Sequence, residues 1–360
     1  PDAMFSFDDY PITRKRTERL LAGLKSRIEA VVVNGIKAEW TLANNKNNEL
    51  ANLVFGDNIG KLTQVQYQRY YSTNQAARDA FIGLDLAGRV WQYTEQFKEE
   101  IEMGLDIGLR NGRSADALSR DLRLFLKHPD KLFRRVRDEH GQLQLSKRAK
   151  AYHPGRGVYR SSYKNAQRLA ATETNIAYRT SDHLRWQQMD FVVGIEIRLS
   201  NNHTLNGRPF HDICDDLQGK YPKDFKFTGW HPYCRCFATT ILKTPEELSA
   251  DTQKILNGET TDGESVNKVD DVPQAFKDWL TENDERLGRA SSVPYFMSDN
   301  PKYTGVQPSY GAVGAVTGTK LGRTATKAAI KVYEDLPAPT LTKEVQDNIT
   351  AIASDMGIKT

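Results

Sequence analysis

Residues 211–236 constrain this chain most, because they gather all three cysteines and two of the seven histidines into one short window. The window begins with His-x-x-Cys, from His211 to Cys214, and closes with His-x-x-Cys-x-Cys, from His231 to Cys236. Cysteines that serve only for packing are expected to scatter along a chain. The clustering therefore predicts two turns that bring these side chains to one place.

Thiolate and imidazole groups at this spacing are the ligands that tetrahedral zinc prefers. We expect zinc as the cofactor, with His211, Cys214, His231 and Cys234 as its preferred ligands. Cys236 is a fifth candidate, although it opens the apolar run 237–242 and can instead point into a core. The alternative is that three reduced cysteines pack a small β-module, while local carbonyl groups satisfy the histidines.

The same window resembles the closing motif of the Mu F-like minor head proteins, also called head morphogenesis proteins, of tailed bacteriophages. Cys214 with residues 217–219 (Leu-Gln-Gly) matches the first part of that motif, and residues 231–236 (His-Pro-Tyr-Cys-Arg-Cys) match the second. The chain carries His211 where the family has its first cysteine, and histidine can replace cysteine as a zinc ligand. Residues 168–179 resemble the helix that precedes the motif, so the resemblance covers roughly residues 80–245.

This resemblance implies a virion structural protein of a tailed phage or prophage, in the head of the particle and in the host cytoplasm during assembly. Its partners would be portal and capsid proteins, and it would assist head morphogenesis, DNA packaging or delivery without enzymatic activity. Members of the family often carry further C-terminal effector domains, so a phage-head scaffold for a toxin domain is one alternative. A glycine-rich loop at 152–159 lacks the P-loop pattern, and we find no nucleotide-binding fingerprint.

The charge of the chain is concentrated in one sector. The net charge is +4, but residues 120–168 hold fourteen Lys or Arg against four acidic residues, which leaves −6 for the remainder. Such a sector is typical of a surface that meets phosphate groups or an acidic protein, although a merely solvated face gives the same pattern. The candidate contacts to phage DNA are Arg134, Arg135, Arg137, Lys147, Arg148 and Lys150.

The hydrophobic periodicity predicts an α+β fold, with a mainly helical body, a basic β-hairpin and a small β-module closed by the Cys/His window. We expect a helix from Thr13 with a break at 44–48, one helix over 75–112, and others over 114–126, 161–189, 276–287 and 341–356. Strands are expected at 192–199 and 237–242. The predicted segments are 1–56, 57–190 with its hairpin at 131–148, 191–248, a linker at 249–272, and 273–360.

Two further expectations concern polar residues. Glu173 and Arg179 are expected to anchor the long helix against the β-module. A metal-dependent nuclease of the HNH type is a second alternative function, with His203, His211 and Asp212 as its catalytic candidates. We find no apolar run that would anchor the chain in a membrane, no secretory leader and no evident small-molecule site.

Overall fold

The computed structural model describes most of the chain up to residue 306, and all described residues belong to one compact unit. They are 5–83, 86–110, 112–114, 116–118, 120, 134–137, 140–145, 150–155, 158–201, 203–205, 208–261, 263–290 and 293–306. The predicted α+β class is confirmed, because the structure is mainly helical with a small three-stranded antiparallel sheet and two separate pairs of short antiparallel strands. The helix predicted at 341–356 lies outside the described residues.

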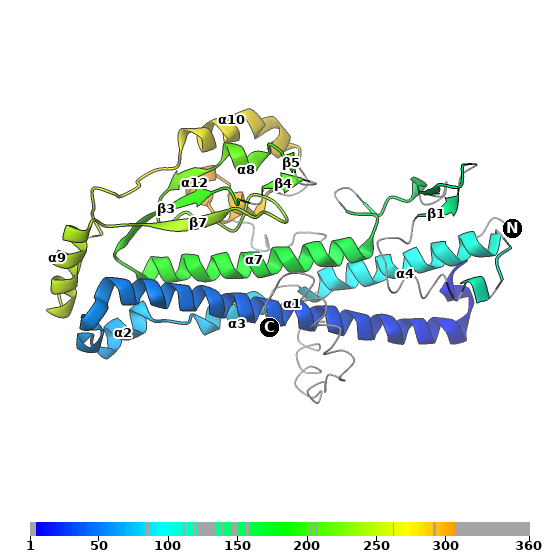
Figure 1. Ribbon diagram of the computed structural model, residues 1–360, viewed down its shortest axis with the longest axis horizontal. Coiled ribbons are helices and arrows are strands. Elements are labelled where there is room, and N and C mark those ends of the chain that lie inside the picture. Colours follow the sequence, from blue (N-terminus) through cyan, green and yellow to red (C-terminus); the bar gives the residue numbers. More distant parts are fainter. Residues whose placement is uncertain are drawn as a thin grey trace. The chain divides into compact units, whose positions relative to one another are not determined.

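Helices dominate the order of elements (Figure 1). The α-helices are α1 (Pro11–Phe55), α2 (Gln64–Tyr70), α3 (Gln75–Ile82), α4 (Leu86–Arg110), α7 (Ser162–Gln188), α8 (Ile213–Asp216), α9 (Pro245–Leu256), α10 (Gln274–Gly288), α11 (Tyr295–Ser298) and α12 (Pro301–Thr304). Two 3₁₀ helices are η1 (Phe7–Asp9) and η2 (Gly56–Lys61). The strands are β1 (Arg134–Arg137), β2 (Leu143–Leu145), β3 (Val192–Arg198), β4 (Thr204–Leu205), β5 (Arg208–Pro209), β6 (Gly219–Tyr221) and β7 (Phe237–Leu242).

The helical body forms where α1 packs along α7 and both contact α4 (Figure 1). Apolar residues that recur every three or four positions on α1, such as Ile36 and Trp40, are buried with Leu169 and Ala177 of α7. At Gly35 the two helices approach closely, since a Cβ atom there would lie 2.6 Å from Cγ2 of Thr174. Glycine at this point therefore permits the close pairing of α1 with α7.

The helix break predicted at 44–48 is wrong, because α1 runs unbroken from Pro11 to Phe55. Asn44 and Asn47 are buried, and their side-chain N–H groups donate hydrogen bonds inside the fold. The Asn44 amide donates to the carbonyl of Trp40 at 3.0 Å, and the Asn47 amide donates to the carbonyl of Ala43 at 2.8 Å and to Asp182 at 2.7 Å. Asparagine ends helices when its side chain competes for the backbone, and here tertiary partners remove that competition.

Arg185 of α7 is a further distant residue that bonds to this part of α1. Its side chain is fully buried and donates to Asn48 of α1 at 2.9 Å. It also donates to the carbonyl groups of Tyr70 and Ser72, which lie at the end of α2 and just after it. One guanidinium group thus joins α7, α1 and the chain that follows α2, and none of these contacts is visible in the local sequence pattern.

The single helix predicted over 75–112 is instead two helices. Helix α3 ends at Ile82, with the N–H of Gly83 donating to the carbonyl of Asp79 at 3.1 Å, and α4 begins at Leu86. Of the helix predicted over 114–126, residues 116–118 and 120 are helical, and the hydroxyl of Ser114 accepts from the N–H of Ala117 at 3.3 Å. Residues 115, 119 and 121–126 lie outside the described residues. The hairpin predicted within 131–148 is confirmed by the antiparallel pairing of β1 with β2.

The β-module has β3 at its centre, with β6 and β7 paired antiparallel on either side. Both predicted strands are confirmed, and β7 spans the predicted residues. Ile195 of β3 is opposite Tyr221 of β6 and Thr240 of β7. The core of the module is continuous with the helical body, because Phe191 contacts the rings of Phe55 and Tyr70. The predicted boundaries at 56 and 190 therefore do not separate independent cores.

The first part of the segment predicted as a linker at 249–272 is helical and packed, whereas the described residues from 257 to 271 are mostly exposed and outside helices and strands. Most of α9 lies within it, and Lys243 forms a buried ion pair with Asp251 at 2.6 Å. The helix predicted around residues 276–287 is confirmed as α10. Phe276 of α10 and Phe296 of α11 are fully buried around Trp230. The C-terminal part of the described chain thus covers the β-module.

We expect His183 of α7 to make the fold sensitive to acid. Burial, and secondarily the nearby charge of Lys226, lower the pKa of His183 to about 4, against an ordinary value of 6.5. The unfolded chain therefore binds a proton before the folded chain does, and stability is lost as pH falls from 6.5 towards 4. The loss from this group is at most about 1.4 kcal/mol per pH unit.

The measurement is the free energy of unfolding in urea at pH 7, 5.5 and 4.5 for the native chain and for His183→Gln. The difference between the two proteins should shrink as the pH falls, because glutamine does not titrate. A difference that stays constant with pH would show that His183 does not carry this dependence.

Candidate metal centre

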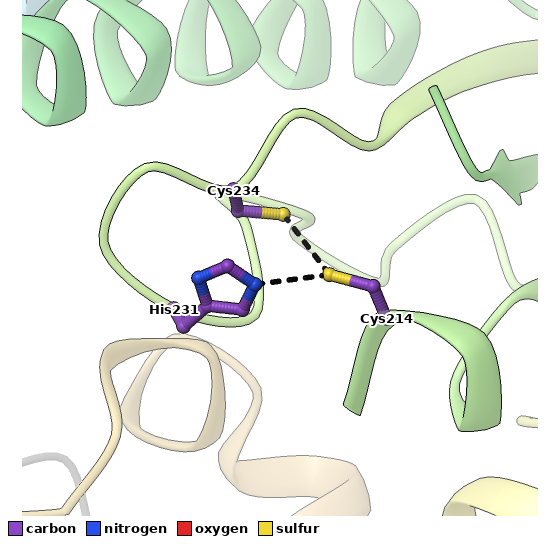
Figure 2. Close-up of side chains that lie close together, drawn as sticks. All are labelled: Cys214, His231 and Cys234. Carbon is purple, nitrogen blue, oxygen red and sulfur yellow. Dashed lines mark hydrogen bonds between the residues drawn. The ribbon is translucent and has the colours of Figure 1, made fainter. Parts of the chain in front are cut away.

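Two turns of the β-module bring Cys214, His231 and Cys234 together (Figure 2). Cys214 lies on the short helix α8, and the other two residues lie in the loop that enters β7. The Cys214 Sγ is 3.1 Å from Nε2 of His231 and 3.8 Å from Sγ of Cys234. The prediction that the window converges on one point is confirmed for these three residues.

The spacing of these atoms suits a zinc ion. Zinc–sulfur bonds of about 2.3 Å in a tetrahedron place two sulfur ligands about 3.8 Å apart. The distance between the sulfur atoms of Cys214 and Cys234 has this value. The sulfur–nitrogen distance of 3.1 Å is shorter than the roughly 3.6 Å of a tetrahedral site, so the His231 ring would shift by about half an ångström.

The ring of His231 is oriented for metal binding. Its Nδ1 lies 2.7 Å from the carbonyl oxygen of Pro232, which can only accept a hydrogen bond, so Nδ1 carries the proton. In the neutral ring, Nε2 then presents its lone pair towards Cys214 (Figure 2). A histidine that binds a metal through one ring nitrogen usually donates a hydrogen bond from the other, which fixes the orientation of the ring.

Cys236, rather than His211, is the better candidate for a fourth ligand. The Cys236 thiol is buried and acts on the pKa of both Cys214 and Cys234, although it is not among the ligand atoms that lie within 4.8 Å of one another. The side chain of His211 is 73 % exposed and pairs with Asp216 at 3.2 Å. Asp212 caps α8, so His211 precedes the helix instead of sharing its first turn with Cys214. The structure therefore brings together three of the predicted ligands, Cys214, His231 and Cys234, and leaves His211 outside the group.

The pKa values of the three thiols are shifted in different directions. Hydrogen bonds from Cys214 and Cys236, together with the charge of Arg179, hold the pKa of Cys234 far below its usual range. The hydrogen bond to Cys234 raises the pKa of Cys214. At Cys236 the hydrogen bond with Cys214 lowers the pKa, but the bond with Cys234 and burial raise it to about 12. A thiolate at Cys234 is thus stabilised first, and a cation would favour deprotonation of the others.

Arg179 of α7 holds the loop that carries these ligands. Its guanidinium donates to the carbonyl of Thr228 at 2.9 Å and to the carbonyls of Cys234 and Cys236 at 2.7 Å each. The anchoring role predicted for Arg179 is therefore confirmed. Glu173 instead pairs with Arg89 of α4, so the predicted contact of Glu173 with the β-module is wrong.

The backbone at Gly229 allows this anchor to approach. Gly229 has a φ of +113°, and a Cβ atom there would lie 2.5 Å from Nη1 of Arg179. It would also lie 3.2 Å from Cβ of Cys234. Glycine is therefore required both for the backbone conformation and for the space that Arg179 occupies.

A second group of potential ligands lies beside the first. His203 Nε2 is 3.1 Å from Asp215 and 3.7 Å from Asp212, and the other oxygen of Asp212 is 3.3 Å from Nε2 of His231. Both carboxylates also cap α8. The Asp212 carboxylate accepts from the N–H of Cys214, and the Asp215 carboxylate accepts from the N–H of Asp212. Of the three nuclease candidates, the structure brings together His203 and Asp212 but not His211.

The residues predicted to contact DNA are only partly described. Lys150 is exposed. Strand β1 carries Arg134, Arg135 and Arg137, whose side chains lie outside the described part of the chain, as do residues 147 and 148. The DNA contact of the hairpin therefore stays a prediction.

Known proteins give no guide to this site. No protein-family model, curated protein or solved structure matches the chain. Among the described helices, none is both long and apolar enough to cross a lipid bilayer. The chemistry of the site follows from its buried thiols, the oriented imidazole and the Arg179 anchor.

Metal content should distinguish the two ligand sets. We expect the purified chain to hold about one zinc ion, which Cys214→Ser and Cys236→Ser lose or bind weakly, whereas His211→Ala retains it. The measurement is elemental analysis after gel filtration, with thermal unfolding of each variant as a check on folding. Loss of zinc from His211→Ala, together with retention of zinc in Cys236→Ser, would instead favour His211, Cys214, His231 and Cys234 as the ligands.

Gly229 should be far less tolerant of a side chain than a glycine that only needs an unusual backbone. Gly258 is a matched control, because it has a φ of +79° and open space around its position. We expect Gly258→Ala to lower the free energy of unfolding by about 1 kcal/mol. Gly229→Ala should lower it by about 3 kcal/mol, since Arg179 must also move. Equal losses in urea unfolding would contradict this account of the Arg179 anchor.

Proposed function

We propose that this chain is a minor head protein of a tailed phage or prophage, a virion structural protein whose β-module is closed by zinc. The observation that carries the proposal is the convergence of the two parts of the closing motif. Cys214 comes from one turn and His231 and Cys234 from another, yet their thiols and imidazole meet at one point. A zinc ion there would join the two turns.

The ligand chemistry supports a structural site over a catalytic one. With Cys236 as the fourth ligand, three thiols and one imidazole would fill all four positions of a tetrahedral zinc, which would leave none for a substrate. The three cysteines are at most 2 % exposed, and the guanidinium of Arg179 donates to the carbonyls of Cys234 and Cys236. Zinc would supply folding free energy here, and the residues of the loop would hold it without moving a proton or binding a reactant.

The remaining features suit an assembly protein of the phage head. A helix of 45 residues, α1, packs along the 27-residue α7, and together they give long surfaces for portal and capsid partners. The basic sector at residues 120–168 provides positive charge for packaged phage DNA. These features fit a protein that acts by contact, in the virion and, during assembly, in the host cytoplasm.

Incorporation into particles tests the proposal. A tagged chain, expressed in the lysogen or infected host that encodes it, should co-purify with heads in a few copies per particle. Cys214→Ser with Cys234→Ser should reduce that incorporation, whereas His211→Ala should not, because its side chain lies outside the cluster. Heads that lack the tagged native chain would overturn the proposal, whatever the metal content of the protein.

A metal-dependent nuclease is the second candidate, and the neighbouring group His203, Asp212 and Asp215 is the observation that favours it. Imidazole and carboxylate groups can activate a water molecule through a divalent ion. Incubation of the purified chain with plasmid DNA and Mg²⁺ or Mn²⁺ separates the candidates. A structural protein leaves the plasmid intact, whereas cleavage that His203→Ala abolishes would favour the nuclease.

A further inference from the structure

The N-terminal half of α7 carries cations and tyrosines in a stretch without acidic residues. From residue 140 to 172 the sequence contains seven Lys or Arg and neither Asp nor Glu. The next acidic residue, Glu173, is buried and paired with Arg89. Glu99 of α4 lies at the flank of this stretch, where it accepts a hydrogen bond from Tyr152 at 3.0 Å.

The exposed residues of this stretch lie on one side of the helix. Lys164, which is exposed, and Arg168, which is half-buried, lie four residues apart and so follow one another along α7. Arg160 lies just before the helix, where its guanidinium donates to the carbonyl of Lys150 at 3.0 Å. Tyr159 and Tyr163 are each 43 % exposed. The guanidinium carbon of Arg168 lies 4.9 Å from the centre of the Tyr159 ring, a stacking arrangement that holds both groups in place.

The metal loop borders this surface. The N–H of Tyr233, between His231 and Cys234, donates to the hydroxyl of Thr172 on α7 at 3.3 Å. We call Tyr159, Arg160, Tyr163, Lys164 and Arg168 the tyrosine–arginine face.

A buried amide fixes the face before any ligand arrives. The Asn165 side chain is fully buried, accepts from the N–H of Tyr159 at 3.0 Å and donates to the Tyr159 carbonyl at 2.7 Å. Gln96 of α4 donates to the same carbonyl at 2.8 Å. Tyr159 is thereby held at the start of α7, where its ring meets Arg168.

We propose that the tyrosine–arginine face binds single-stranded nucleic acid, with phosphate groups against the cations and bases stacked on the tyrosine rings. Cations beside exposed aromatic rings are the combination that binds single strands, because unpaired bases offer their faces for stacking. Duplex DNA keeps its bases stacked on one another. An acidic peptide offers carboxylates to the cations but no bases to stack on the tyrosine rings. The face thus differs from the basic hairpin, where charge alone suggested contact with DNA.

This inference goes beyond the proposed head function and does not require it. Binding of an oligonucleotide by the purified chain and incorporation of the chain into heads are separate measurements. Failure of one therefore leaves the other to be judged on its own result.

The test is fluorescence anisotropy of the purified full chain with three probes: labelled oligothymidylate, duplex DNA of equal length, and poly-glutamate. Tyr163→Ala should weaken oligothymidylate binding about five-fold or more, because one stacking contact is lost. Lys164→Glu should also weaken it, and it should lower the salt dependence by about one phosphate contact. The native chain should prefer oligothymidylate to the other two probes.

Matched controls come from exposed residues elsewhere. Tyr67→Ala removes a tyrosine of α2 that is 49 % exposed, and Lys37→Glu reverses an exposed charge on α1. Both should leave the affinity for oligothymidylate unchanged, and thermal unfolding checks that each variant is folded. Equal affinity for the duplex or for poly-glutamate, no binding at all, or an unchanged affinity in Tyr163→Ala would overturn the proposal.

Discussion

The contact of Arg179 with the metal loop is the interaction on which the β-module depends. One guanidinium group on α7 binds three carbonyls of the loop, at Thr228, Cys234 and Cys236. These carbonyls lie outside strands and helices, and the charged Arg179 side chain supplies their hydrogen bonds instead. Because α7 is itself packed along α1, the loop is held by the most extensive helix pair in the protein.

The module needs this support because its sheet is small. Three strands, two of them at an edge, bury too little surface to be stable alone. The aromatic residues Trp230, Phe276 and Phe296 add a core between the metal loop and the C-terminal helices α10 and α11. Zinc at Cys214, His231, Cys234 and Cys236 would join the two turns, so that Arg179 and the metal would hold the loop together.

The sequence predicted the elements whose pattern is local and missed those fixed by distant partners. Strand β7 and helix α7 were predicted closely, because their periodicity and caps are local signals. The Asn-rich part of α1 was predicted as a break because Arg185 and Asp182, which satisfy its amides, lie more than 130 residues away. In the site, spacing alone favoured His211 over Cys236. Only the cap at Asp212 shows that His211 precedes α8 and faces solvent.

The central claim is that three thiols and one imidazole of this window hold a single zinc ion. X-ray absorption at the zinc edge of the purified protein measures that ligand shell directly. The account predicts about three sulfur atoms at about 2.3 Å and one nitrogen at about 2.0 Å from the metal. A zinc ion surrounded only by oxygen and nitrogen, or a protein that binds no zinc while its thiols are reduced, would contradict it.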